Sequence, residues 1–142
     1  MIQYAFARGA IAAMLLPLTC IAGVPAEPFP FDQELLLDAP PMRPGKRMPL
    51  LNVEPNGNAR IDLWCRTVPA RVEVSDAAIK IEPGPLPESP PEMLSAGQCT
   101  PERMQADEDM LAVLAQVTGW RHEGEGIVLE GPKTLKFRHS DH

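Results

Sequence analysis

Histidine is scarce in this sequence, which holds three in 142 residues. His122 lies beside a predicted turn, and His139 and His142 belong to a C-terminal tail over residues 139–142. A cysteine nucleophile needs a positioned histidine as its base, and a zinc ion needs three or four fixed ligands. The scarcity argues against a cysteine–histidine catalytic pair and against a zinc site. We therefore expect a protein that is not an enzyme and that holds no metal and no cofactor.

The sequence also lacks an excess of basic charge and a phosphate-binding loop. Lysine and arginine number 13 against 19 aspartate and glutamate residues, which gives a net charge of −6. Nucleic acids and anionic membrane surfaces attract basic domains, so we expect this acidic chain to bind neither. The glycine-rich residues 123–126 precede a predicted strand and not a helix, so they do not fit a phosphate cradle.

No apolar run reaches membrane-spanning length, and the longest lies near the N-terminus. One basic residue precedes an apolar run over residues 10–21, and small residues follow up to Ala26. This order predicts a secretory signal peptide over residues 1–26, cleaved after Ala26 or Ala22. Because a bilayer requires roughly 20 apolar residues, we expect no stable membrane insertion after cleavage. The residues before Cys20 are atypical of a lipid-modification site, so we do not expect a lipoprotein.

Cysteine is also sparse, with three residues, and Cys20 lies within the predicted signal peptide. The exported chain keeps Cys65 and Cys99. An exported pair is interpreted first as a disulfide, because export compartments are oxidising. The sequence therefore predicts a Cys65–Cys99 disulfide in a periplasmic or secreted protein. A bridge that closes a loop of about 35 residues stabilises a fold by roughly 3.5 to 4 kcal/mol on the chain-entropy model.

Proline is abundant, with 17 residues, and it helps to divide the chain. Residues 27–49 are predicted to be a proline-rich extended lead-in, in which the apolar residues 35–37 favour a short strand. The domain itself is expected over residues 50–138, followed by the tail.

Short alternating strands make up most of the expected domain. The Asn56-Gly57 pair predicts a tight hairpin turn, since it tolerates positive φ angles. The strand after it is expected to continue through Cys65, which faces inward, while Trp64 and Arg66 face outward. Two more strands follow, and a closing β-meander comes after the helix. The sequence predicts an α+β domain, a small antiparallel β-sheet or partial barrel with one helix packed on it.

The helix is predicted to begin after Thr100, a good N-cap residue, with Pro101 at its first position and Gly119 at its end. Within its apolar sector lie Arg103 and Asp107, spaced i and i+4, which we expect to pair with each other. The remaining acidic side chains of the helix are explained by capping or by solvation.

Four residues are candidates for binding a partner: Trp64, Arg66, Arg103 and Asp107. Aromatic residues make up 5% of the chain, so Trp64 and Trp120 are the main aromatic anchor candidates. Asp107 is a candidate because it lies against the apolar sector of the helix, where a carboxylate serves either a function or an ion pair.

The order of these features resembles the META domain, the small domain of the HslJ-like bacterial heat-shock proteins. In that pattern a strand ends in a glycine-cysteine-asparagine motif, and two strands, a Gly-Pro stretch, a second cysteine, an acidic helix and a closing hairpin follow. The matching features here are Cys65, Gly84-Pro85, Cys99, Asp107 with Met110-Leu111 and Leu114, and residues 127–138. Trp64 and Arg66 stand where the family has glycine and asparagine.

The resemblance implies a secreted or periplasmic domain without enzymatic activity, linked to stress. Its partner is expected to be an envelope protein or a small ligand, and the family supplies no catalytic residues. A second hypothesis is a periplasmic inhibitor or ligand-binding module. That module would contact its partner through the loop of residues 83–98 and through Trp64.

Overall fold

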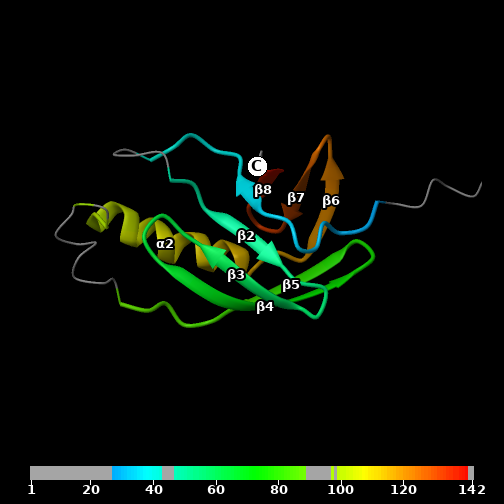
Figure 1. Ribbon diagram of the computed structural model, residues 1–142, viewed down its shortest axis with the longest axis horizontal. Coiled ribbons are helices and arrows are strands. Elements are labelled where there is room, and N and C mark those ends of the chain that lie inside the picture. The colour runs from blue at the N-terminus through cyan, green and yellow to red at the C-terminus, as the bar shows by residue number, and fades with distance from the viewer. Residues whose placement is uncertain (1–26, 43–46, 89–96, 98, 141–142) are drawn as a thin grey trace, which may run out of the picture.

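The computed structural model describes residues 27–42, 47–88, 97 and 99–140 (Figure 1). The predicted signal peptide with Cys20, most of the loop at residues 83–98, and His142 lie outside the described residues. No helix in the described part of the chain is long and apolar enough to span a membrane.

Eight antiparallel strands form a closed barrel in which each strand pairs with the next and β8 pairs back with β1. Their bounds are β1 (Leu35–Leu37), β2 (Leu50–Val53), β3 (Asn58–Asp62), β4 (Thr67–Ser75), β5 (Ala78–Pro83), β6 (Gly119–Glu123), β7 (Gly126–Glu130) and β8 (Leu135–His139). Among the described residues one helix, α2 (Pro101–Leu114), connects β5 to β6. In Figure 1, β2 to β5 run together across the view and β6 and β7 stand at an angle to them. The predicted antiparallel strands with one helix are confirmed, and the barrel is closed.

The lead-in supplies the strand that closes the barrel. Leu35 pairs with Leu51 of β2 on one side and with His139 of β8 on the other. The side chains of Leu35 and Leu37 are buried while Leu36 between them is half-buried, as the alternation of a strand requires. The predicted short strand at residues 35–37 is therefore confirmed, and the barrel draws on the lead-in as well as on residues 50–138.

Apolar side chains from all around the barrel fill its interior. The fully buried ones include Leu35, Leu51, Ile61, Leu63, Ile127 and Leu129. Small barrels are filled in this way, and their ligands then bind at the ends and not in the centre. A ligand-binding site is therefore expected at an end of the barrel.

The predicted hairpin turn and helix start are confirmed. Gly57 has φ +92°, and its N–H donates to the carbonyl oxygen of Glu54 at 2.9 Å. The Thr100 side chain accepts from the backbone N–H of Arg103 at 3.2 Å, which caps the helix. The predicted helix end was wrong, because α2 stops at Leu114 and Gly119 already begins β6.

Strands β5 and β6 share the weakest seam of the barrel. Within these two described strands a single residue pair, Ala78 with Gly119, is in register. Two further hydrogen bonds flank it, from Ile79 to the carbonyl oxygen of Thr118 at 3.1 Å and from Trp120 to that of Ala77 at 3.0 Å. Beyond this point the two strands are linked through α2, which connects them in the chain and contacts β5.

Candidate functional site

Residues 63–66 form a tight connection between β3 and β4, and not the end of a strand. Strand β3 stops at Asp62, and the N–H of Leu63 donates to the carbonyl oxygen of Arg66 at 2.7 Å. All four residues are buried. The predicted alternation, with Trp64 and Arg66 outward, was therefore wrong, because the chain turns here beneath the first turns of α2.

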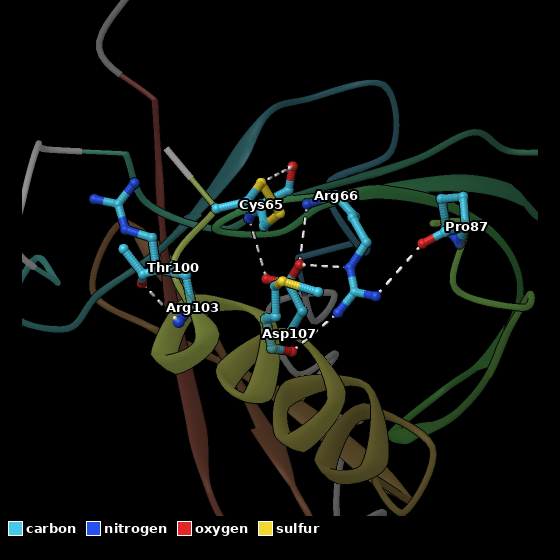
Figure 2. A network of polar contacts seen from close by, with 8 residues as sticks. Cys65, Arg66, Pro87, Thr100, Arg103 and Asp107 are labelled. Atoms are coloured by element: carbon cyan, nitrogen blue, oxygen red, sulfur yellow. Dashed lines mark hydrogen bonds and ion pairs between the residues drawn. A yellow bond between two sulfur atoms is a disulfide. The ribbon is translucent and has the colours of Figure 1, made fainter. Parts of the chain in front are cut away.

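Asp107 holds this connection in place (Figure 2). Its carboxylate accepts hydrogen bonds from the backbone N–H of Cys65 at 3.2 Å and of Arg66 at 3.0 Å. It also pairs with the Arg66 guanidinium, whose Nε lies 3.2 Å away. The Asp107 side chain is 0% exposed and that of Arg66 7%. A buried carboxylate with one cation and two backbone donors is stable only where all its partners are in place.

The rest of the Arg66 guanidinium is also occupied. Its Nη2 donates to the carbonyl oxygen of Met104 at 2.9 Å, and its Nη1 to that of Pro87 at 3.4 Å. Arg66 therefore joins the β3–β4 connection, the helix and the segment after β5, as Figure 2 shows.

The predicted ion pair between Arg103 and Asp107 was wrong. The buried Arg103 donates from Nη2 to the carbonyl oxygen of Met42 at 3.0 Å, and the ion partner of Asp107 is Arg66. Spacing on one helix placed the two side chains in one sector. It could not reveal that an arginine 41 positions away comes closer.

The predicted disulfide joins Cys65 to Cys99, with 5.2 Å between the Cα atoms and a sequence separation of 34. Both cysteines are buried. The bridge ties the β3–β4 connection to the residue before the Thr100 cap, while Asp107 ties the same connection to the next helical turns. The helix start is thus fastened to the barrel at two points.

Trp64 does not offer a contact surface. It is 9% exposed and belongs to the hydrophobic core, and its indole N–H has no hydrogen-bond partner among the described residues. With Trp64, Arg66, Arg103 and Asp107 all buried, these four residues form a structural cluster. The Asp107 carboxylate and the Arg66 guanidinium are engaged by one another and by backbone groups within the fold.

A cleft of about 650 Å³ lies at the other end of β4, beside the turn that leads into β5. We call it the aromatic cleft; its characteristic lining residues are Glu27, Phe29, Phe31, Asp76, Trp120 and His122. It combines three separate segments: the start of the lead-in, the β4–β5 turn and β6. Because β4 spans 9 residues, roughly 25 to 30 Å at 3.3 Å per residue, the cleft is far from the disulfide.

The rings of the aromatic cleft pack against one another. Phe29 meets Trp120 edge to face with centroids 5.2 Å apart, and it lies 5.0 Å from Phe31. His122 packs edge-on to Trp120, also at 5.2 Å. The buried Phe29 and Trp120 form the base, and the half-buried Phe31 and His122 form the edge. Aromatic pairs prefer these tilted and edge-to-face geometries, so the rings support one another in the cleft wall.

His122 is fixed by the lead-in. Its Nε2 lies 3.0 Å from the carbonyl oxygens of Glu27 and Pro28, and its Nδ1 lies 3.4 Å from the Glu27 carboxylate. A ring nitrogen that faces a carbonyl oxygen must donate its hydrogen, so Nε2 carries a proton. These contacts hold the lead-in against β6 and shape one wall of the cleft.

The charges beside the cleft are paired along the barrel surface. Arg121 donates to Glu130 at 2.7 Å and to Glu123 at 2.9 Å, and these hydrogen bonds raise the pKa of Arg121, Glu130 contributing most. Glu123 also accepts from Lys136 at 3.3 Å, and the hydrogen bonds from Lys136 and then Arg121 lower the pKa of Glu123. The positive charge of Arg121 is thus matched by two carboxylates.

Sequence reasoning found one residue of the aromatic cleft, Trp120. His122 was placed beside a turn, and the lead-in was interpreted as a proline-rich extended segment. A signal was present: Phe29 and Phe31 are spaced i and i+2, which places both on one face of an extended chain.

Within residues 27–42, 47–88, 97 and 99–140, no group of three or more histidine, cysteine, aspartate or glutamate side chains is arranged to hold a metal ion. No family model, curated protein or solved structure matches the chain. The two features of the described residues that bear on function are the buried cluster around Asp107 and the aromatic cleft.

Proposed function

We propose that the chain is an exported, non-catalytic envelope domain of the META type, with a binding or protective role in stress and the Cys65–Cys99 disulfide as its staple. The observation that carries this proposal is the buried disulfide beside the Asp107–Arg66 ion pair. A structural disulfide persists in an oxidising compartment, and the fold of a small domain depends on it.

The order of elements supports the META resemblance. Cys65 follows β3, two strands and Gly84-Pro85 come next, and Cys99 stands just before α2. Asp107 lies on the inner face of that helix with Met110 and Leu111, and three strands close the barrel after it. Trp64 and Arg66 replace the family's glycine and asparagine, and Arg66 provides the counter-charge for Asp107.

The state of Asp107 supports a non-catalytic role. A catalytic carboxylate must reach a substrate, yet this one is 0% exposed and accepts three hydrogen bonds from Cys65 and Arg66. Its geometry is that of an anchor for the chain turn.

The alternative of a ligand-binding module is favoured by the aromatic cleft and not by Trp64. Trp64 is core, and of the loop at residues 83–98 the part from 89 to 96 and residue 98 lie outside the described residues. The cleft is apolar and of ligand size, since small-molecule sites commonly occupy about 300 to 1,000 Å³.

The test is expression of the full chain with a C-terminal tag in a bacterium, followed by fractionation and non-reducing mass spectrometry. We expect processed chain in the envelope or medium, beginning after Ala26 or Ala22, with a peptide that links Cys65 to Cys99. A chain that stays in the cytoplasm, or that alkylates at both cysteines without reductant, would overturn the proposal.

A screen against hydrolase and transferase substrates tests the non-catalytic part. We expect no turnover above that of an identically purified unrelated envelope protein. Turnover that is lost on Asp107→Asn, in a sample whose circular dichroism matches the wild type, would show that Asp107 is more than an anchor.

A further inference from the structure

We propose that the aromatic cleft binds an apolar ligand that carries a positive charge, such as an aromatic or amphipathic cation. The inference rests on the proposed binding role of the domain and names the class of ligand. It is drawn from three features of the cleft: its ring faces, its charge balance and its position on the barrel.

The first feature is the ring surface. Phe29, Phe31 and Trp120 line one cleft. The ring centroid of Phe29 lies 5.0 Å from that of Phe31 and 5.2 Å from that of Trp120. The face of an aromatic ring is electronegative, and a cation within about 6 Å of a ring centroid is attracted to it. Aromatic rings that line a ligand-sized cleft favour an organic cation, because apolar contact and charge attraction then act together.

The second feature is the balance of charge around the cleft. The Arg121 guanidinium pairs with Glu130 through Nε and with Glu123 through Nη1. The His122 ring lies against the Glu27 carboxylate. Asp76 also lines the cleft, and its carboxylate has no hydrogen-bond or ion-pair partner among the described residues. The unmatched charge among the described side chains that line the cleft is therefore negative, which complements a cation and repels an anion.

Asp76 is held in position by the backbone. It lies in the two-residue turn between β4 and β5 with φ +40°, a left-handed conformation that aspartate and asparagine tolerate better than most residues. Because Asp76 and Ala77 are the turn itself, the backbone places Asp76 at the cleft lining. Net charge adds to this local effect, since the chain as a whole carries −6.

The third feature is the position of the cleft. The barrel interior is filled with side chains, so a ligand has no room in the centre, and the cluster around Asp107 occupies the other end of β4. The cleft lies beside the β4–β5 turn, and its volume of about 650 Å³ is large enough for a compact aromatic ion.

The test compares two probes of nearly equal size and shape but opposite charge, tetraphenylphosphonium and tetraphenylborate, by isothermal titration in potassium-free buffer. We expect the wild-type chain to bind tetraphenylphosphonium at least about tenfold more tightly. In a heteronuclear NMR spectrum the indole N–H signal of Trp120, assigned with Trp120→Phe, should shift on binding while that of Trp64 stays in place.

Two variants separate the charge from the rings. Asp76→Asn keeps the left-handed turn and is expected to weaken tetraphenylphosphonium binding by about three- to tenfold. Phe31→Leu keeps the half-buried apolar side chain but removes the ring, and it is expected to weaken the cation about two- to fivefold with little effect on the anion. Asp109→Asn is the matched control, because Asp109 is exposed on α2, does not line the cleft, and carries the same change of net charge.

Equal affinity for both probes would overturn the charge preference, and equal weakening by Asp76→Asn and Asp109→Asn would overturn the role of Asp76. Failure of both probes to bind at about 1 mM would overturn the site itself. None of these outcomes changes where the protein is exported or whether Cys65 is joined to Cys99. Failure of the ligand proposal can therefore be told apart from failure of the proposed function.

Discussion

The carboxylate of Asp107 completes the turn between β3 and β4. The backbone N–H groups of Cys65 and Arg66 are buried where no strand lies beside them, and buried donors must find acceptors. A side chain from α2 supplies the acceptor, and the Arg66 guanidinium balances its charge. The turn therefore depends on one residue that is 41 or 42 positions away in the chain.

Replacement of Asp107 by asparagine is expected to destabilise the fold by about 3–5 kcal/mol, because it leaves the buried Arg66 without its counter-charge. Urea unfolding measured by tryptophan fluorescence gives the free energy of unfolding. The control is Asp109→Asn, which changes an exposed carboxylate on the same helix and should cost less than about 0.5 kcal/mol. A loss below about 1 kcal/mol for Asp107→Asn would show that the ion pair is dispensable.

Glu123 allows a pH-dependent prediction. Its pKa is lower in the folded state, chiefly through the hydrogen bond from Lys136 and then that from Arg121. A lowered folded-state pKa means that these contacts stabilise the fold above the unfolded-state value, and that this contribution is lost as the pH falls through the folded-state pKa. We expect a carboxyl titration followed by NMR to place the midpoint of Glu123 below the ordinary glutamate range. Lys136→Met should raise that midpoint, and an unchanged midpoint would contradict the assignment.

At the scale of elements, the start of α2 is fastened to the β3–β4 connection by the disulfide and by Asp107. Replacing both Cys65 and Cys99 by alanine is expected to lower the free energy of unfolding by about 4 kcal/mol, as the chain-entropy model gives for a loop of this length. Urea unfolding with and without reductant checks this value, and reductant should have no effect on the double variant. A wild-type stability that reductant does not change would contradict the prediction.

Strands β7 and β8 meet closely at Gly126. A Cβ atom there would overlap the carbonyl oxygen of Phe137, so the two strands would have to separate. We expect Gly126→Ala to destabilise the fold by about 1–3 kcal/mol or more. Gly124→Asn is the control, since Gly124 has φ +58° and nothing lies within 4 Å of its Cβ position. Equal thermal unfolding temperatures for the two variants would show that the strands yield more easily than the geometry indicates.

The sequence predicted the features that depend on neighbouring residues. It did not predict those that depend on contacts between residues far apart in the chain. Local rules predicted the Asn56-Gly57 turn, the Thr100 cap and the short strand at residues 35–37. The orientation of Trp64 and Arg66 could not be predicted, because the partner that turns the chain inward, Asp107, comes from a separate element. The aromatic cleft was missed for the same reason: three segments build it, and no single segment shows the pattern.

At the scale of the whole molecule, barrel closure depends on the lead-in. We expect a chain that begins at Glu34, and so keeps β1, to unfold cooperatively but with lower stability, since it loses the buried Phe29. A chain that begins at Asp38 also loses β1 and leaves the edges of β2 and β8 exposed, so we expect it to lose cooperative unfolding. Circular dichroism with urea distinguishes the two, and matching cooperative transitions would mean that residues 50–139 fold without the closing strand.

The single residue pair between β5 and β6 gives the barrel a preferred place to open. A hydrogen-bonded backbone amide exchanges its hydrogen only when the bond opens. Protection from exchange should therefore be lowest along this seam, while the neighbouring strand pairs stay protected. The disulfide limits how far an opening can extend, because it holds the start of α2 to the β3–β4 connection even when β5 and β6 part. The barrel can thus open between β5 and β6 while the start of α2 stays attached to the β3–β4 connection.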